Sequence, residues 1–407
     1  MYRVSPHVRH FASALGAGAA VATLWVNLNP DSYFDVIERR LWQPHLPQQI
    51  SYDPVLTLQT ITSQGLMALF IAFIAKELWE ALVLERGALS GRARWAMPLG
   101  AVLGGVIGSV AVWLAWLPMD PSFGELSRFA GWPLPIGSDV VLCYVLGAKV
   151  FGRDHPALHL LLLLAIAFDI LGLLALGIGA TDGLRPVFLL MPLIALTLVW
   201  TLRARFAHPG ASEVQHRRAG ALWPYLLAGL FCWTGVILSG LPGALGLIFL
   251  IPVVPHAGRS FGLFAEAESL LHDPLNRLAN LLVRPLPVIL FLFGLTRGGV
   301  DLAALGPMTA RVLAAAWLGK PLGLLIGAAV TLRVTGWHLP LGLRWSDLAL
   351  VAILSGMAIT VPLLSLSTAL PGGIPSEQAR LGLALSLLFG PLAIGLAPLW
   401  RRPKPQN

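Results

Sequence analysis

The chain has 407 residues, of which 56% are hydrophobic and only 12% are charged, and its mean hydropathy is +0.75. A soluble globular protein of this size does not need so much apolar surface, so the composition excludes that class and predicts a polytopic membrane protein. The net charge of +8 is spread over short loops and forms no basic run interleaved with aromatic residues, which argues against nucleic-acid binding.

The first apolar run, residues 11–28, follows basic residues, as the core of a signal peptide would. Its length, and the many apolar runs behind it, predict an uncleaved first helix instead. The whole pattern predicts an all-α polytopic membrane protein with about twelve transmembrane helices in a single domain, 1–407. The apolar segments are 11–28, 57–84, 96–117, 133–151, 156–178, 186–202, 221–238, 242–254, 281–296, 308–332, 346–369 and 380–399.

Lysine and arginine residues are unevenly divided between successive loops. If twelve spans alternate across the bilayer, the richer loops fall on one face, which the positive-inside rule assigns to the cytoplasm together with both termini. These loops contain Arg3, Arg9, Arg86, Arg92, Arg94, Lys149, Arg153, Arg203, Arg205, Arg217, Arg218, Arg259, Arg277, Arg284, Arg333, Arg344, Arg401, Arg402 and Lys404.

Two acidic residues, Glu77 and Glu80, lie toward the cytoplasmic end of the second span, close to Lys76 and Arg86. Such a cluster could form a negative funnel that attracts cations, or a pH-responsive entrance. An interfacial salt-bridge network is an equally good interpretation, and the residues alone do not separate the two.

The fourth and eleventh spans contain residues that interrupt helices. These are Pro135 and Gly137 in the fourth span, and Gly356, Thr360 and Pro362 in the eleventh. A broken membrane helix exposes backbone groups, which is tolerable only inside protein or beside a watery cavity. One break in each half of the chain predicts a substrate site between inverted repeats, with a proline kink that serves packing alone as the alternative.

Asp169 lies near the middle of the fifth span, LLLLLAIAFDILGLLALGIG. A carboxylate there costs roughly 2.5 to 3.5 kcal/mol even on the mildest insertion scale, so it requires a use or a partner. Lys320 places a charged ammonium inside the tenth span, and it needs a partner for the same reason. We therefore expect a buried pair between Asp169 and Lys320, with Asp139, at the break of the fourth span, as the rival partner.

Burial disfavours the charged form of a carboxylate and a nearby ammonium favours it, so small changes in hydration would let Asp169 bind or release a proton. Asp139, Asp169, Ser138 and freed backbone carbonyls could hold either a sodium ion or protons. Mutually exclusive binding of these two is the minimum that exchange requires. A structural ion pair that only fixes helix packing is the alternative.

Other chemistry finds no support in the sequence. It contains no P-loop, no HExxH motif and no candidate nucleophile with its base, so neither an enzyme nor a cofactor is indicated. An ATP-driven pump would also need a nucleotide-binding domain, and no polar stretch is long enough.

Several motifs together resemble the NhaA-type sodium/proton antiporters of bacterial inner membranes, over residues from about 57 to 395. The motifs are GWPLPIGSD at 131–139, LAIAFDILG at 164–172, HAGRS at 256–260, GLTRGGVDL at 294–302, GKPLG at 319–323 and AITVP at 358–362. GWPLPIGSD and GKPLG are specific in combination, whereas either alone would be weak.

The resemblance implies a twelve-helix fold in which the broken fourth and eleventh helices cross near the membrane midplane. It implies that Asp139 stands at the cation site, that Lys320 pairs with the ion-binding aspartates, and that Glu77 belongs to a pH-responsive region. In the resembled family the polar segment at 29–54 forms a periplasmic hairpin that helps to build a homodimer. A simple connecting loop is the alternative reading of that segment.

One departure from the family stands out. The family has two adjacent aspartates followed by Leu-Gly, where this chain has Phe168, Asp169, Ile170, Leu171 and Gly172. An ungapped count makes Ile170 the replacement of the second aspartate, whereas a one-residue gap makes it Phe168. Either way one carboxylate is missing, which bears on sodium coordination and on the electrogenic stoichiometry associated with the pair.

These observations predict a secondary antiporter that exchanges sodium or lithium for protons across the bacterial inner membrane and contributes to pH and sodium homeostasis. Asp169 and Asp139 would bind the ion transiently. The alternatives are a degenerate antiporter-like protein that binds or senses without transport, and a proton-coupled carrier of another small solute.

Overall fold

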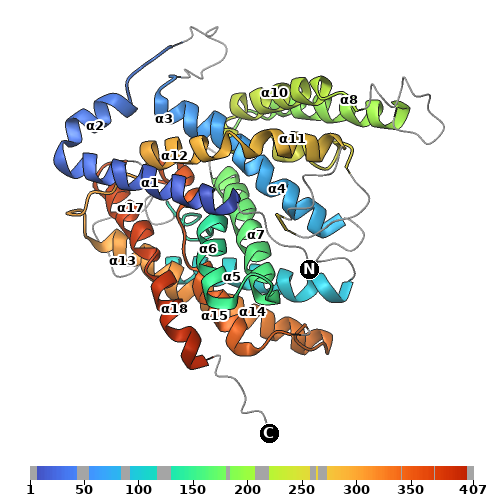
Figure 1. Ribbon diagram of the computed structural model, residues 1–407. Helices are drawn as coiled ribbons and strands as arrows, with labels where there is room; N and C mark the ends of the chain where they lie inside the picture. The colour runs from blue at the N-terminus through green and yellow to red at the C-terminus, as the bar shows by residue number, and fades with distance from the viewer. Residues whose placement is uncertain are drawn as a thin grey trace. The chain divides into compact units, whose positions relative to one another are not determined.

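The computed structural model describes residues 7–43, 55–83, 92–116, 130–179, 184–206, 220–256, 263–264, 273–340, 342–370 and 372–400. In these residues the regular structure is helical, which confirms the all-α prediction (Figure 1). The α-helices are α1 (His7–Leu28), α2 (Pro30–Ile37), α3 (Leu58–Thr60), α4 (Met67–Val83), α5 (Arg92–Ala115), α6 (Val140–Phe151), α7 (Pro156–Gly179), α8 (Leu190–Phe206), α10 (Trp223–Leu238), α11 (Pro274–Val283), α12 (Leu286–Arg297), α13 (Pro307–Ala314), α14 (Lys320–Thr335), α15 (Trp345–Ser355), α16 (Thr360–Ala369), α17 (Ile374–Ser386) and α18 (Phe389–Trp400).

Within the described ranges, six helical stretches are long and apolar enough to cross a bilayer. They are His7–Leu28, Trp95–Ala115, Pro156–Gly177, Pro186–Ala204, Pro307–Thr335 and Ile374–Trp400. Two bent pairs, α11 with α12 and α15 with α16, raise the number to as many as eight if each pair is one span. The shorter apolar helices α6 and α10 come in addition, so the chain is a multi-pass membrane protein.

Two predicted spans differ from the structure. The segment 242–254, expected to be a short eighth helix, contains only the 3-10 turns Gly243–Leu245 and Ile248–Leu250. It can leave the α-helix because the side-chain oxygen of Gln64 accepts a hydrogen bond from the Gly243 N–H at 2.5 Å. The expected ninth helix, 281–296, does not start until Leu286: residues 281–283 end α11, and α12 is bent from α11 by 57°. Pro285 lies between the two helices and has no N–H to continue the helical hydrogen bonds.

Some sequence predictions fall on residues that the structure does not describe. In the polar segment 29–54, α2 is capped by Asn29, whereas 44–54 lie outside the described ranges. Of HAGRS, only His256 is described. Several loop cations are likewise outside, namely Arg3, Arg86, Arg128, Arg217, Arg218, Arg259, Arg401, Arg402 and Lys404.

The chain divides into two compact units. Unit 1 comprises Met1–Ala12, Ala88–Leu176 and Val300–Asn407, and unit 2 comprises Ser13–Gly87 and Gly177–Gly299. All of the predicted ion-site residues lie in unit 1. The predicted entrance residues of the second span lie in unit 2.

Unit 1 is built around direct backbone contact between α5 and α14. Glycines four residues apart lie on one face of each helix: Gly100, Gly104 and Gly108 on α5, and Gly323 and Gly327 on α14, preceded by Gly319. A Cβ added at Gly104 would lie 2.2 Å from the carbonyl oxygen of Gly323 and 2.7 Å from the Cα of Gly327. Small residues allow this close approach in membranes, where helix packing cannot rely on a hydrophobic driving force.

Unit 2 has its own packed framework. Helices α8 and α10 lie side by side (Figure 1). Helix α1 contacts α12 so closely that a Cβ at Gly18 would lie 2.1 Å from the carbonyl oxygen of Phe291. Beyond this contact, the hydroxyl of Tyr33 in α2 donates to the carbonyl of Leu295 at 2.9 Å. Unit 2 therefore has a core that does not depend on the predicted ion site.

The glycine contact of unit 1 predicts that one added methyl group lowers the stability of the protein at the α5–α14 contact but not at an open position. Gly104→Ala should destabilise the protein by about 1–3 kcal/mol, since the new Cβ overlaps backbone atoms that cannot rotate away. Gly395→Ala in α18 is the matched control, because nothing lies within 4 Å of its added Cβ. Thermal unfolding of the purified protein in detergent measures both, and equal midpoints would contradict the tight α5–α14 contact.

Candidate functional site

The predicted break of the fourth span is a turn followed by a half-length helix. Ala130 to Ile136 form turns, because Pro133 and Pro135 have no N–H to donate within a helix. Helix α6 begins only at Val140, and Asp139 is its N-cap, with its Oδ1 accepting the Leu142 N–H at 2.8 Å. The carboxylate thus satisfies a backbone donor at the helix start, which is the usual work of an N-cap aspartate.

The eleventh span is broken where the sequence predicts it. Helix α15 ends at Ser355, Gly356 to Ile359 are non-helical, and α16 begins at Thr360 after a bend of 45°. Pro362 lies in the first turn of α16, where a missing N–H removes no helical hydrogen bond. The break leaves the carbonyl of Ser355 without a helical partner.

The two interruptions contact each other inside unit 1. A Cβ at Gly137 would lie 2.8 Å from the Cδ of Pro362, so only a glycine lets the two segments approach this closely. The Ser138 hydroxyl donates to the carbonyl of Ser355 at 2.7 Å. The Thr360 hydroxyl donates to Oδ2 of Asp139 in a short hydrogen bond. Each interruption therefore satisfies polar groups that the other exposes.

Asp169 reaches this junction from α7. Its side chain is 1% exposed, and its Oδ1 accepts the Ser138 N–H at 2.8 Å. Its Oδ2 is buried and has no hydrogen-bond partner in the structure. A buried carboxylate oxygen without a donor is costly unless a proton or a cation occupies it for part of the time.

Lys320 also reaches the junction, but not as the sequence predicts. Its side chain is fully buried, and its ammonium donates to the carbonyls of Gly137 at 2.5 Å and Ser355 at 3.2 Å. Neither Asp169 nor Asp139 forms an ion pair with it, although all three residues are described. The ammonium instead donates to the carbonyls released by the two breaks, and Asp169 interacts with it electrostatically without a direct ion-pair contact.

The sequence did not reveal two of the groups around Lys320. One is the Ser355 carbonyl, which accepts from both Lys320 and Ser138. The other is the ring of Phe168, whose centroid lies 5.2 Å from the ammonium. The position of Ser355 next to the break at Gly356 was a signal for the first, since a carbonyl there loses its helical donor. The signal for Phe168 was its place in the motif, since a one-residue gap aligns it with an aspartate of the resembled family.

Glu77 and Glu80 lie in unit 2 within a buried ion network. The ammonium of Lys76 is 3.2 Å from Oε1 of Glu77 and 2.9 Å from Oε2 of Glu80, and the three side chains are only 2–4% exposed. Oε2 of Glu77 also accepts the Phe264 N–H, and the amide of Asn276 donates to Glu80 at 3.3 Å. The cluster is thus a closed network and not an open acidic surface.

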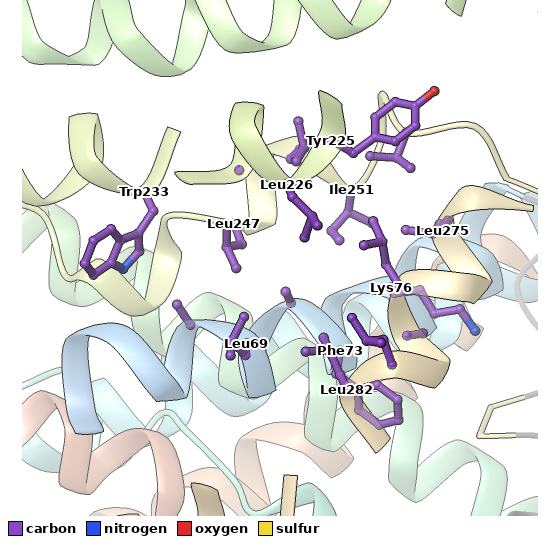
Figure 2. Close-up of a pocket in the computed structure, with 18 of the residues that line it drawn as sticks. Leu69, Phe73, Lys76, Tyr225, Leu226, Trp233, Leu247, Ile251, Leu275 and Leu282 are labelled. Carbon is purple, nitrogen blue, oxygen red and sulfur yellow. The ribbon is translucent and has the colours of Figure 1, made fainter. Parts of the chain in front are cut away.

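Unit 2 also contains an apolar cavity of about 370 Å³ between α4, α10, α11 and the segment 242–254 (Figure 2). Apolar side chains line most of it, and Lys76 and Tyr225 are polar residues at one end. None of the residues around Asp169 lines this cavity. It therefore adds no room for a solute to the junction of unit 1.

The junction presents the kind of ligands that a small alkali cation prefers. Carboxylates, hydroxyls and backbone carbonyls are hard oxygen donors, whereas soft or nitrogen ligands select other metals. The buried ammonium offsets part of the negative charge. Such a site can hold a monovalent cation or a proton at the same carboxylate, but not both together.

The hydrogen bond between Thr360 and Asp139 predicts that the hydroxyl of residue 360 contributes to the stability of the protein. Thr360→Val removes the hydroxyl and should destabilise the protein by about 1–3 kcal/mol, because a buried carboxylate oxygen loses its donor. Thr360→Ser keeps the hydroxyl and should remain closer to the wild type. Thermal unfolding in detergent compares the two, and identical midpoints would mean that the hydroxyl does not stabilise the junction.

Comparisons with known proteins point to one family. The protein-family model described as Na+/H+ antiporter 1 matches residues 9–397. A Na(+)/H(+) antiporter NhaA of Jannaschia sp. (strain CCS1) is 37% identical and covers 97% of each chain, and one of Geobacter metallireducens is 32% identical over 96% of each. The solved sodium proton antiporter MjNhaP1 of Methanocaldococcus jannaschii aligns over 97% of each chain with a TM-score of 0.50 at 15% identity, a likeness of fold alone.

Proposed function

Because the chain belongs to the NhaA-type Na+/H+ antiporter family, we propose that it exchanges sodium or lithium for protons across the bacterial inner membrane. The observation that carries this proposal for the residues themselves is the free Oδ2 of Asp169. It is a buried carboxylate oxygen at the meeting point of two broken helices, and no described residue donates a hydrogen bond to it.

Asp169 is the residue that binds the cation or the proton in this proposal. Its Oδ1 is held by the Ser138 N–H, which leaves Oδ2 for the exchanged species. Asp139 and Ser138 stand beside it as further oxygen donors. Protonation removes the charge that attracts the cation, so release of one species accompanies binding of the other, as exchange requires.

Lys320 supplies fixed positive charge to the same site. Two carboxylates without a nearby cation would repel each other strongly at this depth. The ammonium attracts Asp169 electrostatically while its hydrogen bonds go to the two broken segments. Lys320 thus balances the charge of the site without occupying the oxygen that binds the ion.

Family membership also leads us to propose the architecture around this junction. The proposed fold has twelve spans in inverted repeats, with the interrupted helices crossing near the midplane, and the two units work as one transporter domain over 1–407. The contact of Gly137 with Pro362 supports the crossing. The charge pattern of the loops supports cytoplasmic termini, and a homodimer follows from the resemblance.

The alternatives are less well supported. A protein that binds or senses ions without transport could use the same carboxylate, but the relatives are named antiporters, which favours exchange. For a proton-coupled carrier of another small solute, the apolar cavity of about 370 Å³ in unit 2 offers no space beside Asp169, because its lining residues do not belong to the junction.

Asp169→Asn tests the proposed role directly. The amide has the shape of the carboxylate and its oxygen can still accept from Ser138, but it neither titrates nor attracts a cation. We expect insertion to be retained and exchange to fall to background. Everted membrane vesicles that report proton release on addition of sodium, lithium or potassium measure this.

Asp154→Asn is the matched control, since the same change falls on an exposed residue between α6 and α7. It should leave the exchange signal unchanged. An unaltered signal in Asp169→Asn would remove Asp169 from the mechanism. A flat response of the wild type to every cation across pH would favour the non-transporting alternative.

We also propose that the Lys76, Glu77 and Glu80 cluster makes exchange pH-responsive. If protonation of Glu80 weakens its pair with Lys76, then Glu80→Gln removes that step and should flatten the dependence of exchange rate on pH. Glu38→Gln, at an exposed position after α2, should not change the profile. If Glu80→Gln keeps the wild-type profile and only lowers thermal stability, the cluster is a structural salt-bridge network.

A further inference from the structure

Phe168 lies directly beneath the ammonium of Lys320. The residue precedes Asp169 in α7, its side chain is fully buried, and its ring centroid is 5.2 Å from the Lys320 Nζ. A cation this close to an aromatic face is attracted by the ring quadrupole, and the attraction is strongest where water is excluded. Lys320 is itself 0% exposed, so this contact is fully desolvated.

The Phe168 ring occupies a space that a glycine in the neighbouring helix α5 leaves open. A Cβ at Gly105 of α5 would lie 2.6 Å from the Cζ of Phe168 and 3.6 Å from the Cγ of Lys320. Only a glycine at 105 therefore leaves room for the ring. Because the backbones of α5 and α14 touch on either side of this level, neither helix can move away to release it.

The ring completes the surroundings of the ammonium. The other close partners are the carbonyls of Gly137 and Ser355, with the Ser138 hydroxyl farther away at 3.5 Å. All of these groups are electrically neutral, and none of them is a carboxylate. The ammonium is therefore held without any contribution from a carboxylate hydrogen bond.

We propose that Phe168 is a positioning residue for exchange: its ring holds the Lys320 ammonium on the carbonyls of the two interruptions and keeps it off Asp169, so that the lysine does not compete with the transported cation. This inference rests on the proposed antiport function. It also identifies Phe168, and not the half-buried Ile170, as the residue that takes the place beside the lysine where a second carboxylate is missing.

A packing role and a positioning role make different predictions. If Phe168 only fills space, a smaller apolar residue lowers thermal stability and leaves the affinity for sodium unchanged. If Phe168 positions the ammonium, its removal lets the lysine reach Oδ2 of Asp169, and sodium must then displace it. The dissociation constant for sodium therefore distinguishes the two roles.

The experiment compares the full-length wild type with Phe168→Leu and with 2,6-difluorophenylalanine at position 168. Fluorine at these ring positions weakens the quadrupole and adds nothing at Cζ or Cε1, the two ring atoms nearest to a Cβ at Gly105. Isothermal titration calorimetry with sodium chloride at fixed pH and ionic strength gives the Kd. We expect it to rise about tenfold in Phe168→Leu and by a smaller factor in the fluorinated protein, with bound-state stoichiometry unchanged.

Phe293→Leu is the matched control, since Phe293 is a fully buried phenylalanine in α12 of unit 2. It should lower the unfolding midpoint without changing the Kd for sodium. If Phe168→Leu does not fold, the fluorinated protein decides, because its shape is nearly that of the wild type. A fluorinated protein with the wild-type Kd overturns the inference.

Exchange in reconstituted vesicles separates this inference from the proposed function. If the wild type binds sodium but does not exchange it, the proposed antiport function is contradicted. The role of Phe168 is still tested in that case, by the Kd for sodium of the variants relative to that of the wild type. A wild type that neither binds nor exchanges sodium or lithium overturns both.

Discussion

The structure of unit 1 depends on one constraint, which is that the backbone groups released by two broken helices must find partners inside an apolar bundle. Water is not available at that depth, and each unsatisfied group is expensive. The chain meets this need by bringing the breaks together. Ser138 donates to the carbonyl of Ser355, and Lys320 donates to the carbonyls of both segments. The break that would weaken an isolated helix thus becomes the feature that joins two of them.

The same solution decides how the buried charges behave. Because the ammonium of Lys320 is satisfied by carbonyls and by the ring of Phe168, the carboxylate of Asp169 keeps one oxygen without a donor. Asp139 differs, since its two oxygens accept from Leu142 and Thr360. Two aspartates in one site are therefore not equivalent: one fixes the start of α6, and the other remains open to a proton or a cation.

In unit 2, in contrast, the buried charged groups form direct ion pairs with one another. Lys76 pairs directly with Glu77 and Glu80, and Asn276 and the Phe264 N–H satisfy further carboxylate oxygens. The adjacent cavity is lined mainly by apolar side chains and contributes no ligand for an ion. The carboxylates of unit 2 are therefore held by ion pairs and hydrogen bonds, whereas in unit 1 one oxygen of Asp169 has no donor among the described residues.

The sequence by itself determined the membrane class, the helical architecture, the positions of both breaks and the identity of the intramembrane charged residues. These follow from composition and from proline, glycine and N-cap preferences, which act over a few neighbouring residues. It did not show which groups accept the hydrogen bonds of the Lys320 ammonium. Only the tertiary structure decided this point, because the contact of Lys320 with Gly137 joins residues 183 positions apart and competes with every other acceptor in the junction. The absence of a regular α-helix in 242–254 also depends on a distant residue. The Gly243 N–H donates to the side chain of Gln64, which lies 179 positions away in the sequence.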